Sequence, residues 1–183
     1  TATLFREIAS DIVIGGDRSF LTINKKDKQV LNLVQSKARL STVYISKKIN
    51  SDPKTVRLKI KSLQQQSIIK AFRPIFNVQN TGFIVNKILL KYHNLFVEKE
   101  QELLTFCKFN PNIVELIKLF GEWDLELTVE TKTRDEFRNV YISIREKFED
   151  IIQDFESFPV FKTHKKEFLP VSTFLEEKNK NEP

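Results

Sequence analysis

Apolar residues recur at helical spacing in three short segments near the start of the chain, at about residues 26–35, 42–49 and 53–66. Ser41 or Thr42 can cap the second segment. Asp52 is a favourable N-cap for the third, and Pro53 occupies the first helical position, where its missing N–H has no cost. Three short helices in this order predict a helix-turn-helix.

The third segment has two different sides. Val56, Ile60 and Leu63 are spaced i, i+4, i+7 and form an apolar stripe that would pack against the other two helices. The opposite side carries long basic side chains, namely Lys54, Arg57 and Lys61. A helix that buries one side and offers hydrogen-bond donors on the other has the pattern of a DNA recognition helix.

Residues 68–76 are apolar and follow the third helix at once. Their pattern predicts a strand that leaves the helix, and Pro74 favours an edge or a bend because proline has no N–H for a ladder. This strand would be the wing of a winged helix-turn-helix, or a linker to the next domain.

In the second half of the chain, the spacing of apolar residues switches in turn between the pattern of a strand and that of a helix. Leu125, Leu127 and Val129 alternate with polar residues, which is typical of a strand with one buried face. The predicted order is strand, helix, strand, strand, helix, strand, at about residues 82–92, 96–109, 113–120, 123–130, 134–148 and 151–161. This order predicts a split ferredoxin-like βαββαβ sheet with helices on one face. Because the other face needs a cover, we expect a second copy of the chain to pack there.

The predicted fold class is therefore α+β, with a winged helix-turn-helix followed by a ferredoxin-like domain. We expect an N-terminal arm or the remnant of a preceding unit, a helix-turn-helix domain, a wing or linker strand, a ferredoxin-like domain for effector binding and oligomerisation, and a polar tail. Their expected boundaries are residues 1–22, 23–67, 68–81, 82–170 and 171–183.

Charge is distributed unevenly along the chain. Residues 25–73 carry 13 lysines and arginines but only two acids, Asp27 and Asp52, a local charge of +11 in a chain of net charge +6. A generic solvated surface would mix the two signs. The segregation instead indicates a DNA-binding head joined to a neutral-to-acidic regulatory or oligomerising domain.

Nine residues are the predicted contacts with double-stranded DNA. Arg57 is central and can reach the N7 and O6 atoms of guanine with two N–H groups. Lys54 and Thr55 lie near the end of the helix that approaches bases first. The remaining six contacts are Lys59 and Lys61 on the same helix, and Lys47, Lys48, Arg39 and Ser51 as phosphate contacts.

Composition and motifs exclude several classes of function. No apolar run approaches the ~20 residues that a membrane helix needs, so no membrane partner is expected. The single cysteine, Cys107, excludes an intramolecular disulfide and favours a reducing, cytoplasmic setting. His93, His164 and Cys107 have no zinc-site spacing, and no nucleotide-binding or nucleophile motif occurs. We expect no metal, no cofactor and no catalytic residue.

Two stretches resemble the Lrp/AsnC family of transcription regulators. The first is Asp52-Pro53-Lys54-Thr55-Val56-Arg57-Leu58-Lys59-Ile60-Lys61-Ser62-Leu63 with Ile68-Ile69-Lys70-Ala71-Phe72-Arg73, which is similar to that family's recognition helix and exit strand. The second is Gly121-Glu122-Trp123-Asp124, similar to its Gly-x-aromatic-Asp turn. The resemblance covers residues 23–161. It departs from the family at Gln64-Gln65-Gln66, where acids are usual, and at Ser67, where a glycine commonly ends the helix.

The resemblance implies a RAM-type second domain that forms dimers or higher homo-oligomers through its sheet. It also implies an amino-acid-like effector near the Gly-x-aromatic-Asp turn. Gly121 would offer backbone groups to the effector carboxylate, Asp124 would accept its ammonium group, and Trp123 would line the pocket. The same turn also fits a purely structural role, with Gly121 as the hairpin residue and the other two packed at a subunit contact.

Two other functions remain open on the sequence alone. Some proteins that resemble this family are tetrapyrrole (siroheme-type) decarboxylases, and His93 at the end of the first predicted strand of the second domain is the one histidine placed to take part. Alternatively, the chain could be a ligand-sensing module that does not bind DNA. The basic helix argues against both, because neither function would need it.

Overall fold

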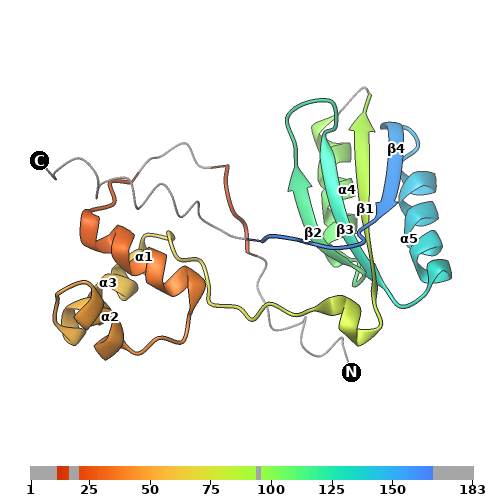
Figure 1. Ribbon diagram of the computed structural model, residues 1–183. Helices are drawn as coiled ribbons and strands as arrows, with labels where there is room; N and C mark the ends of the chain where they lie inside the picture. Colours follow the sequence, from red (N-terminus) through yellow and green to blue (C-terminus); the bar gives the residue numbers. More distant parts are fainter. Residues whose placement is uncertain (1–11, 17–20, 94–95, 167–183) are drawn as a thin grey trace, which may run out of the picture. The chain divides into compact units, whose positions relative to one another are not determined.

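The computed structural model describes residues 12–16, 21–93 and 96–166, which divide into two compact units (Figure 1). Described residues up to 74 belong to a helical unit, and residues 75–164 belong to a unit built on a β-sheet. We call them the head and the sheet unit, and describe each by itself. The expected N-terminal arm lies largely outside the described residues, and the expected polar tail lies wholly outside them.

The head contains the three predicted helices, α1 (Lys25–Ser36), α2 (Thr42–Lys48) and α3 (Pro53–Gln65). Each begins after a residue whose side chain accepts a hydrogen bond from a backbone amide, and these residues are Asn24, Ser41 and Asp52. The Asp52 carboxylate accepts from the amides of Lys54 at 2.8 Å and Thr55 at 3.2 Å. The prediction that Asp52 caps α3 is confirmed, and local capping explains where each helix starts.

A small apolar core joins the three helices. Its buried members are Val30, Leu31, Val34, Ile45, Ile49, Val56, Leu63 and Ile69. The predicted stripe of α3 is confirmed, since Val56 and Leu63 are buried and Ile60 packs against the same cluster while partly exposed. Full burial of one such side chain contributes roughly 1.5–3 kcal/mol, so this core holds α3 in one orientation about its axis.

Helix α3 ends sharply although it lacks the expected glycine. Ser67 takes up the left-handed conformation itself, with a φ of 58°. Its amide donates to the Gln64 carbonyl at 3.0 Å, and the Ile68 amide donates to the Leu63 carbonyl at 2.9 Å. This is a Schellman ending, and its hydrogen bonds offset the cost of about 1–2 kcal/mol of placing a side chain in that conformation.

The strand predicted for residues 68–76 is wrong. Ile69 is buried in the head core, but residues 70–77 have no regular secondary structure and their side chains are exposed. A strand needs a partner backbone, and no described segment pairs with this one. Pro74 also removes one of the donors that such pairing would use.

The sheet unit has the predicted strand and helix order. After a short 3-10 turn, η2 (Val78–Thr81), come β1 (Ile84–Tyr92), α4 (Val97–Phe109), β2 (Ile113–Lys118), β3 (Leu125–Thr131), α5 (Arg134–Lys147) and β4 (Ile152–Pro159). The strands are antiparallel and lie in the order β2-β3-β1-β4. This is the ferredoxin-like arrangement, and the predicted fold class is confirmed.

One face of the sheet carries the core, beneath α4 and α5. Leu125, Leu127 and Val129 of β3 are fully buried there, as their alternation predicts. The opposite face, which we call the open face, is polar at its centre. Lys87 forms ion pairs with Glu126 and, at 3.5 Å, with Glu115, whose carboxylate also accepts a hydrogen bond from Thr128 at 2.9 Å. These cross-strand pairs come from β1, β2 and β3 and brace the sheet from the uncovered side.

Candidate nucleic-acid interface

The side of α3 turned away from the head core is basic. Lys54, Arg57 and Lys61 are all exposed and lie opposite Val56 and Leu63. We call these three residues the basic face. The cap and the core set its direction, because Asp52 determines where α3 starts and the buried stripe sets its rotation. Thr55 is also exposed and lies in the first turn of α3.

Lys59 differs from the other cations of α3. Its side chain is 20% exposed, and its ammonium nitrogen lies 2.6 Å from a carboxylate oxygen of Asp27, which is 17% exposed. The same nitrogen lies 3.5 Å from the side-chain oxygen of Asn24. The Lys59 ammonium group therefore forms an ion pair that links α3 to the start of α1. For this reason Lys59 is not among the DNA contacts proposed below.

The other predicted phosphate contacts come from the turns and from α2. Lys47 and Lys48 are exposed in the last turn of α2, with the Lys48 ammonium 5.8 Å from the centre of the Tyr44 ring. Arg39 is exposed between α1 and α2. Ser51 is half-buried between α2 and α3, and its amide donates to the Ser46 carbonyl at 2.9 Å.

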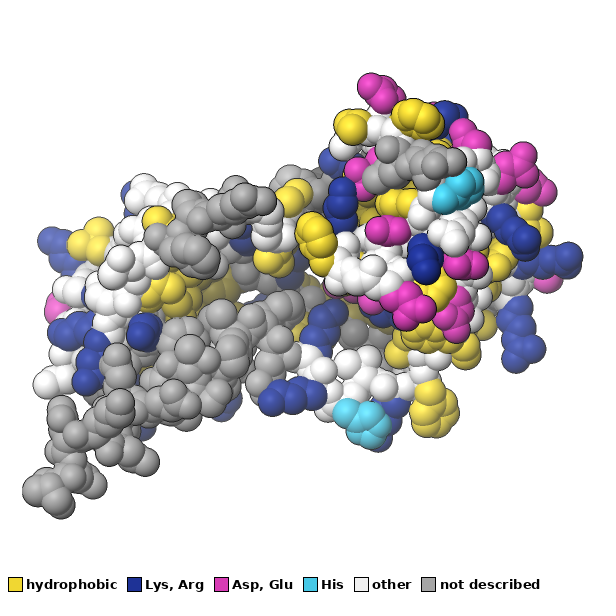
Figure 2. Space-filling view, turned by 90° about the horizontal axis from the view of Figure 1, so that it is seen from above, with side chains coloured by type: hydrophobic (Ala, Val, Ile, Leu, Met, Phe, Trp, Pro, Cys, Tyr) yellow, Lys and Arg dark blue, Asp and Glu magenta, His cyan; other side chains and the backbone are white. Residues whose placement is uncertain are grey.

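The surface of the molecule reflects this division of charge. In Figure 2 dark blue lysines and arginines mark the head, whereas the magenta acids visible in that view lie mainly over the sheet unit. The basic face lies within residues 25–73, where only two acids accompany 13 lysines and arginines, so few acids compete for its donors. Such a surface attracts a polyanion and holds it by many weak contacts.

The predicted effector residues lie in the connection from β2 to β3. Gly121 is exposed with a φ of 153°, and Trp123 is half-buried. Asp124 is bound into the end of the sheet. Its amide donates to the Leu90 carbonyl at 2.9 Å, and its carboxylate accepts from the amide of Tyr92 at 2.8 Å. One carboxylate oxygen therefore extends the β1–β3 ladder, and this partner was not foreseen from the sequence.

Tyr92 links this turn to the interior of the sheet unit. Its hydroxyl is buried, and burial raises the pKa of the phenol above its usual value, with the nearby Glu100 carboxylate as the next cause. The buried Glu100 side chain forms an ion pair with Lys118 at 2.6 Å. Asp124 thus lies at the edge of a polar cluster that joins the ends of β1 and β2 to the first turn of α4.

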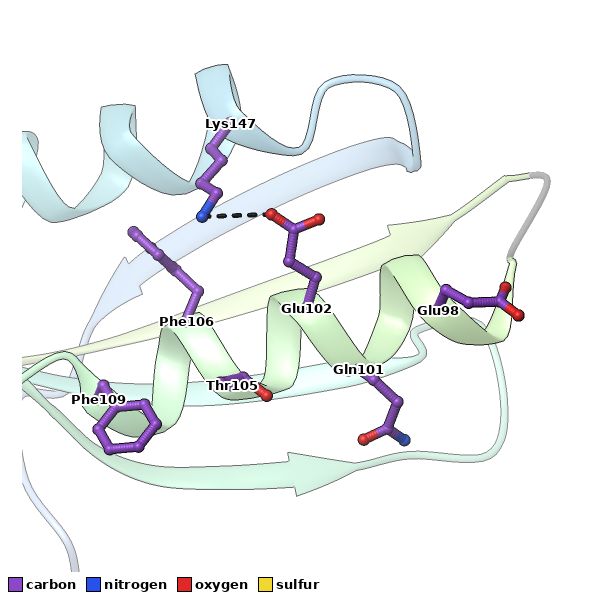
Figure 3. Close-up of a pocket in the computed structure, with 7 residues that line it drawn as sticks. All are labelled: Glu98, Gln101, Glu102, Thr105, Phe106, Phe109 and Lys147. Carbon is purple, nitrogen blue, oxygen red and sulfur yellow. Dashed lines mark ion pairs between the residues drawn. The ribbon is translucent and has the colours of Figure 1, made fainter.

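Figure 3 shows a surface hollow where α4 meets α5. The ammonium of Lys147 reaches across it, 3.3 Å from Glu102 and 4.8 Å from the centre of the Phe106 ring. Its charge is already paired and stacked, so the hollow is better explained as a clamp between two helices than as a ligand site. Within the described chain, neither this hollow nor a second one beside α5 and β4 is lined by Gly121, Trp123 or Asp124.

Groups that could perform chemistry are scattered in the described residues. His93 is exposed just after β1, where its amide donates to the Ile151 carbonyl at 2.9 Å. Burial raises the pKa of the Cys107 thiol to about 12, so it is protonated at neutral pH and a poor nucleophile. No group of three or more His, Cys, Asp or Glu within residues 12–16, 21–93 and 96–166 could hold a metal ion. The helices of that part of the chain are too short or too polar to cross a membrane.

Comparison with known proteins finds a family model over the head and transcriptional regulators that match a longer part of the chain. A family model described as winged helix-turn-helix DNA-binding matches residues 23–70. Over 102 residues the chain is 32% identical to the HTH-type transcriptional regulator Ptr1 of Methanocaldococcus jannaschii, covering 56% of this chain and 68% of that protein.

Two solved structures share the fold at low sequence identity. One is an AsnC family transcriptional regulator from Agrobacterium tumefaciens, with a TM-score of 0.72 at 17% identity. The other is the transcriptional regulator NMB0573 from Neisseria meningitidis in complex with L-methionine, with a TM-score of 0.72 at 19% identity. Each comparison covers 84% of this chain and 100% of the other.

Proposed function

Because this chain belongs to the Lrp/AsnC family of transcription regulators, we propose that its basic face binds double-stranded DNA with sequence preference. It is a DNA-binding regulator of that type. The proposal that the basic face reads DNA sequence rests on one observation. Lys54, Arg57 and Lys61 are exposed on the side of α3 opposite the core. Arg57 contacts guanine, while Lys54 and Thr55 approach bases from the first turn. Lys61, Lys47, Lys48, Arg39 and Ser51 bind phosphates.

We further propose that two copies pair through the open faces of their sheet units. The open face is uncovered within one chain, although its central charges are already paired. Its margins carry exposed apolar residues, Ile117 on β2 and Phe158 on β4. Such a face suits a second copy, because the paired charges around Lys87 can be buried at lower cost than unpaired ones. The dimer presents two heads to DNA.

The test of DNA binding is fluorescence anisotropy with the full chain and a duplex from its own promoter region. If six to eight phosphates are neutralised per dimer, log Kd should change with log salt concentration with a slope of roughly 5 to 7. Arg57→Ala should weaken binding roughly tenfold or more at the preferred site. A slope near zero, or equal affinity of the variant and the parent, would contradict the assignment of α3 as the recognition helix.

For the second unit we propose an amino-acid-like effector at the connection from β2 to β3. The complex of the Neisseria regulator with L-methionine supports this class of ligand. Gly121 offers backbone groups to the effector carboxylate, Trp123 lines the pocket, and the second carboxylate oxygen of Asp124 accepts the ammonium group. Gly121 is exposed and Trp123 is half-buried in one chain, and another copy of the chain would complete the pocket at this turn.

Two substitutions at Asp124 separate its structural and ligand roles. Asp124→Asn keeps an oxygen that can accept the Tyr92 amide, so the fold should persist while amino-acid binding is lost with the charge. Asp124→Ala removes the acceptor as well and should lower the free energy of unfolding by about 1–3 kcal/mol. Calorimetric titration with a panel of L-amino acids, with urea denaturation in parallel, measures both. Undiminished amino-acid binding by Asp124→Asn, or none by the parent protein, would contradict the effector proposal.

The decarboxylase alternative is not favoured. The relatives of this chain are named as transcriptional regulators, and His93 lies exposed outside the predicted effector turn. A ligand-sensing module that does not bind DNA is not favoured either, because such a function does not explain the exposed cations of the basic face.

A further inference from the structure

A leucine lies at the edge of the basic face, between Lys54 and Lys61 along the helix axis. Leu58 is 59% exposed, although it is flanked along the helix surface by Lys54, four residues before it, and Lys61, three residues after it. Positions three and four apart are neighbours on one side of a helix, so these three side chains share one patch. Arg57 borders the patch, on the side toward Ile60.

The head core does not account for this leucine. The buried stripe of α3 is formed by Val56 and Leu63, with Ile60 beside them, and Leu58 lies on the opposite side. Isolated exposed leucines are common on protein surfaces and by themselves indicate nothing. The position of Leu58 is different, because it adjoins the cations proposed to contact DNA.

We propose that Leu58 contacts the 5-methyl group of thymine in the major groove and so gives the protein a preference for thymine at that position. This inference rests on the proposed function of the basic face. Thymine is the base that presents an apolar group in the major groove, where the other three offer hydrogen-bond donors and acceptors alone. Leucine cannot bond to phosphate or to a polar base edge, so its contribution depends on the identity of the base.

The flanking lysines explain how a leucine could reach that group. Lys61, three residues after Leu58, can anchor the helix to phosphate, while Lys54, four residues before it, approaches the bases together with the leucine. Cytosine at the same position lacks the methyl group, so the apolar contact with Leu58 would be lost. Burial of the methyl group is therefore the contribution that favours thymine.

The test compares thymine with deoxyuridine, which pairs identically but lacks the methyl group. Preferred duplexes are first selected from a random library with the full chain, and each thymine is then replaced singly. For the parent protein, replacement at one or more positions of each half-site should weaken binding about fourfold, the factor that corresponds to burying one methyl group. For Leu58→Ala the same replacements should change affinity by less than about 1.5-fold, by the loss of that contact.

Val97→Ala is the matched control. It truncates a 69% exposed apolar side chain on α4 in the sheet unit, and should retain the thymine dependence of the parent. Circular dichroism should show that both variants keep the parent fold, because both side chains are exposed.

The possible results separate this inference from the function on which it rests. Failure of the parent to bind any duplex at low salt overturns DNA binding itself, and the Leu58 assignment with it. Tight binding that is insensitive to every thymine methyl overturns the Leu58 assignment alone. The assignment also fails if Leu58→Ala keeps the thymine dependence, or loses affinity equally for thymine and deoxyuridine duplexes.

Discussion

The triple variant Lys54→Glu, Arg57→Glu and Lys61→Glu is expected to bind its preferred duplex roughly 10³-fold more weakly than the parent in low salt. Each change replaces a cation of the basic face by an anion that repels phosphate, and a dimer carries the change twice. The fold should persist, because all three side chains are exposed and none belongs to the head core. Fluorescence anisotropy over a series of salt concentrations measures the loss.

The control for this variant has the same change in net charge in the other unit. Arg134, Arg138 and Arg145 are exposed on α5, and their replacement by glutamate should reduce affinity for DNA by less than tenfold at moderate salt. Equal losses in the two triple variants would mean that net charge, and not the position of the basic face, governs binding. That result would remove α3 from the proposed interface.

Phe148→Ala is expected to have the largest effect on stability, lowering the free energy of unfolding of the sheet unit by about 3–5 kcal/mol. The ring is fully buried where α5 ends, and packs edge-on against Phe106 with their centres 5.5 Å apart. Its removal leaves a cavity between α4, α5 and the start of β4. Because domains are held by only about 5–15 kcal/mol, urea denaturation should detect a transition at much lower denaturant concentration.

Phe109→Ala provides the comparison within the same unit. Its ring is 79% exposed at the end of α4, so truncation should change stability by no more than about 0.5 kcal/mol. Protein concentration must be held constant between the two variants, since the proposed dimer would couple stability to association. If both variants lost a similar free energy of unfolding, the exposure of Phe109 in a single chain would not hold in solution.

Local chemistry made much of the head predictable. Asp52 and Pro53 identify the start of α3, because a cap acts on amides within three residues of it. The stripe of Val56, Ile60 and Leu63 identifies the side that is buried, since a helix repeats every 3.6 residues. From these two facts the direction of Lys54, Arg57 and Lys61 follows without any knowledge of the rest of the chain.

The direction of the Lys59 side chain could not be predicted from the pattern of α3 alone. The sequence pattern places Lys59 among the predicted DNA contacts, whereas the structure shows it turned toward Asp27, 32 residues earlier in the chain. No helical pattern in α3 contains that information, because it depends on how α1 crosses α3. Leu58 is the reverse case: its place outside the apolar stripe could be seen in the sequence, but its exposure among lysines could be measured only in the folded head.

In the sheet unit, the alternation of Leu125, Leu127 and Val129 was sufficient to predict a strand with one buried face. The residues near 68–76 have comparable apolar character, yet form no strand. The difference is that a strand is completed by hydrogen bonds to another backbone, and composition does not say whether one is within reach. The Asp124 carboxylate depends in the same way on Tyr92, which β1 delivers from 32 residues away.

The sequence by itself therefore determined the helices, the caps of α2 and α3, the βαββαβ order, the segregation of charge and the family. These features arise from interactions within a few turns or from patterns that repeat along one element. Only the tertiary structure decided that Lys59 is tied to Asp27, that Asp124 completes the β1–β3 ladder, and that residues 70–77 remain without a strand partner. Each of these depends on which distant segment the fold brings within hydrogen-bonding distance, and that is settled by packing of the whole unit.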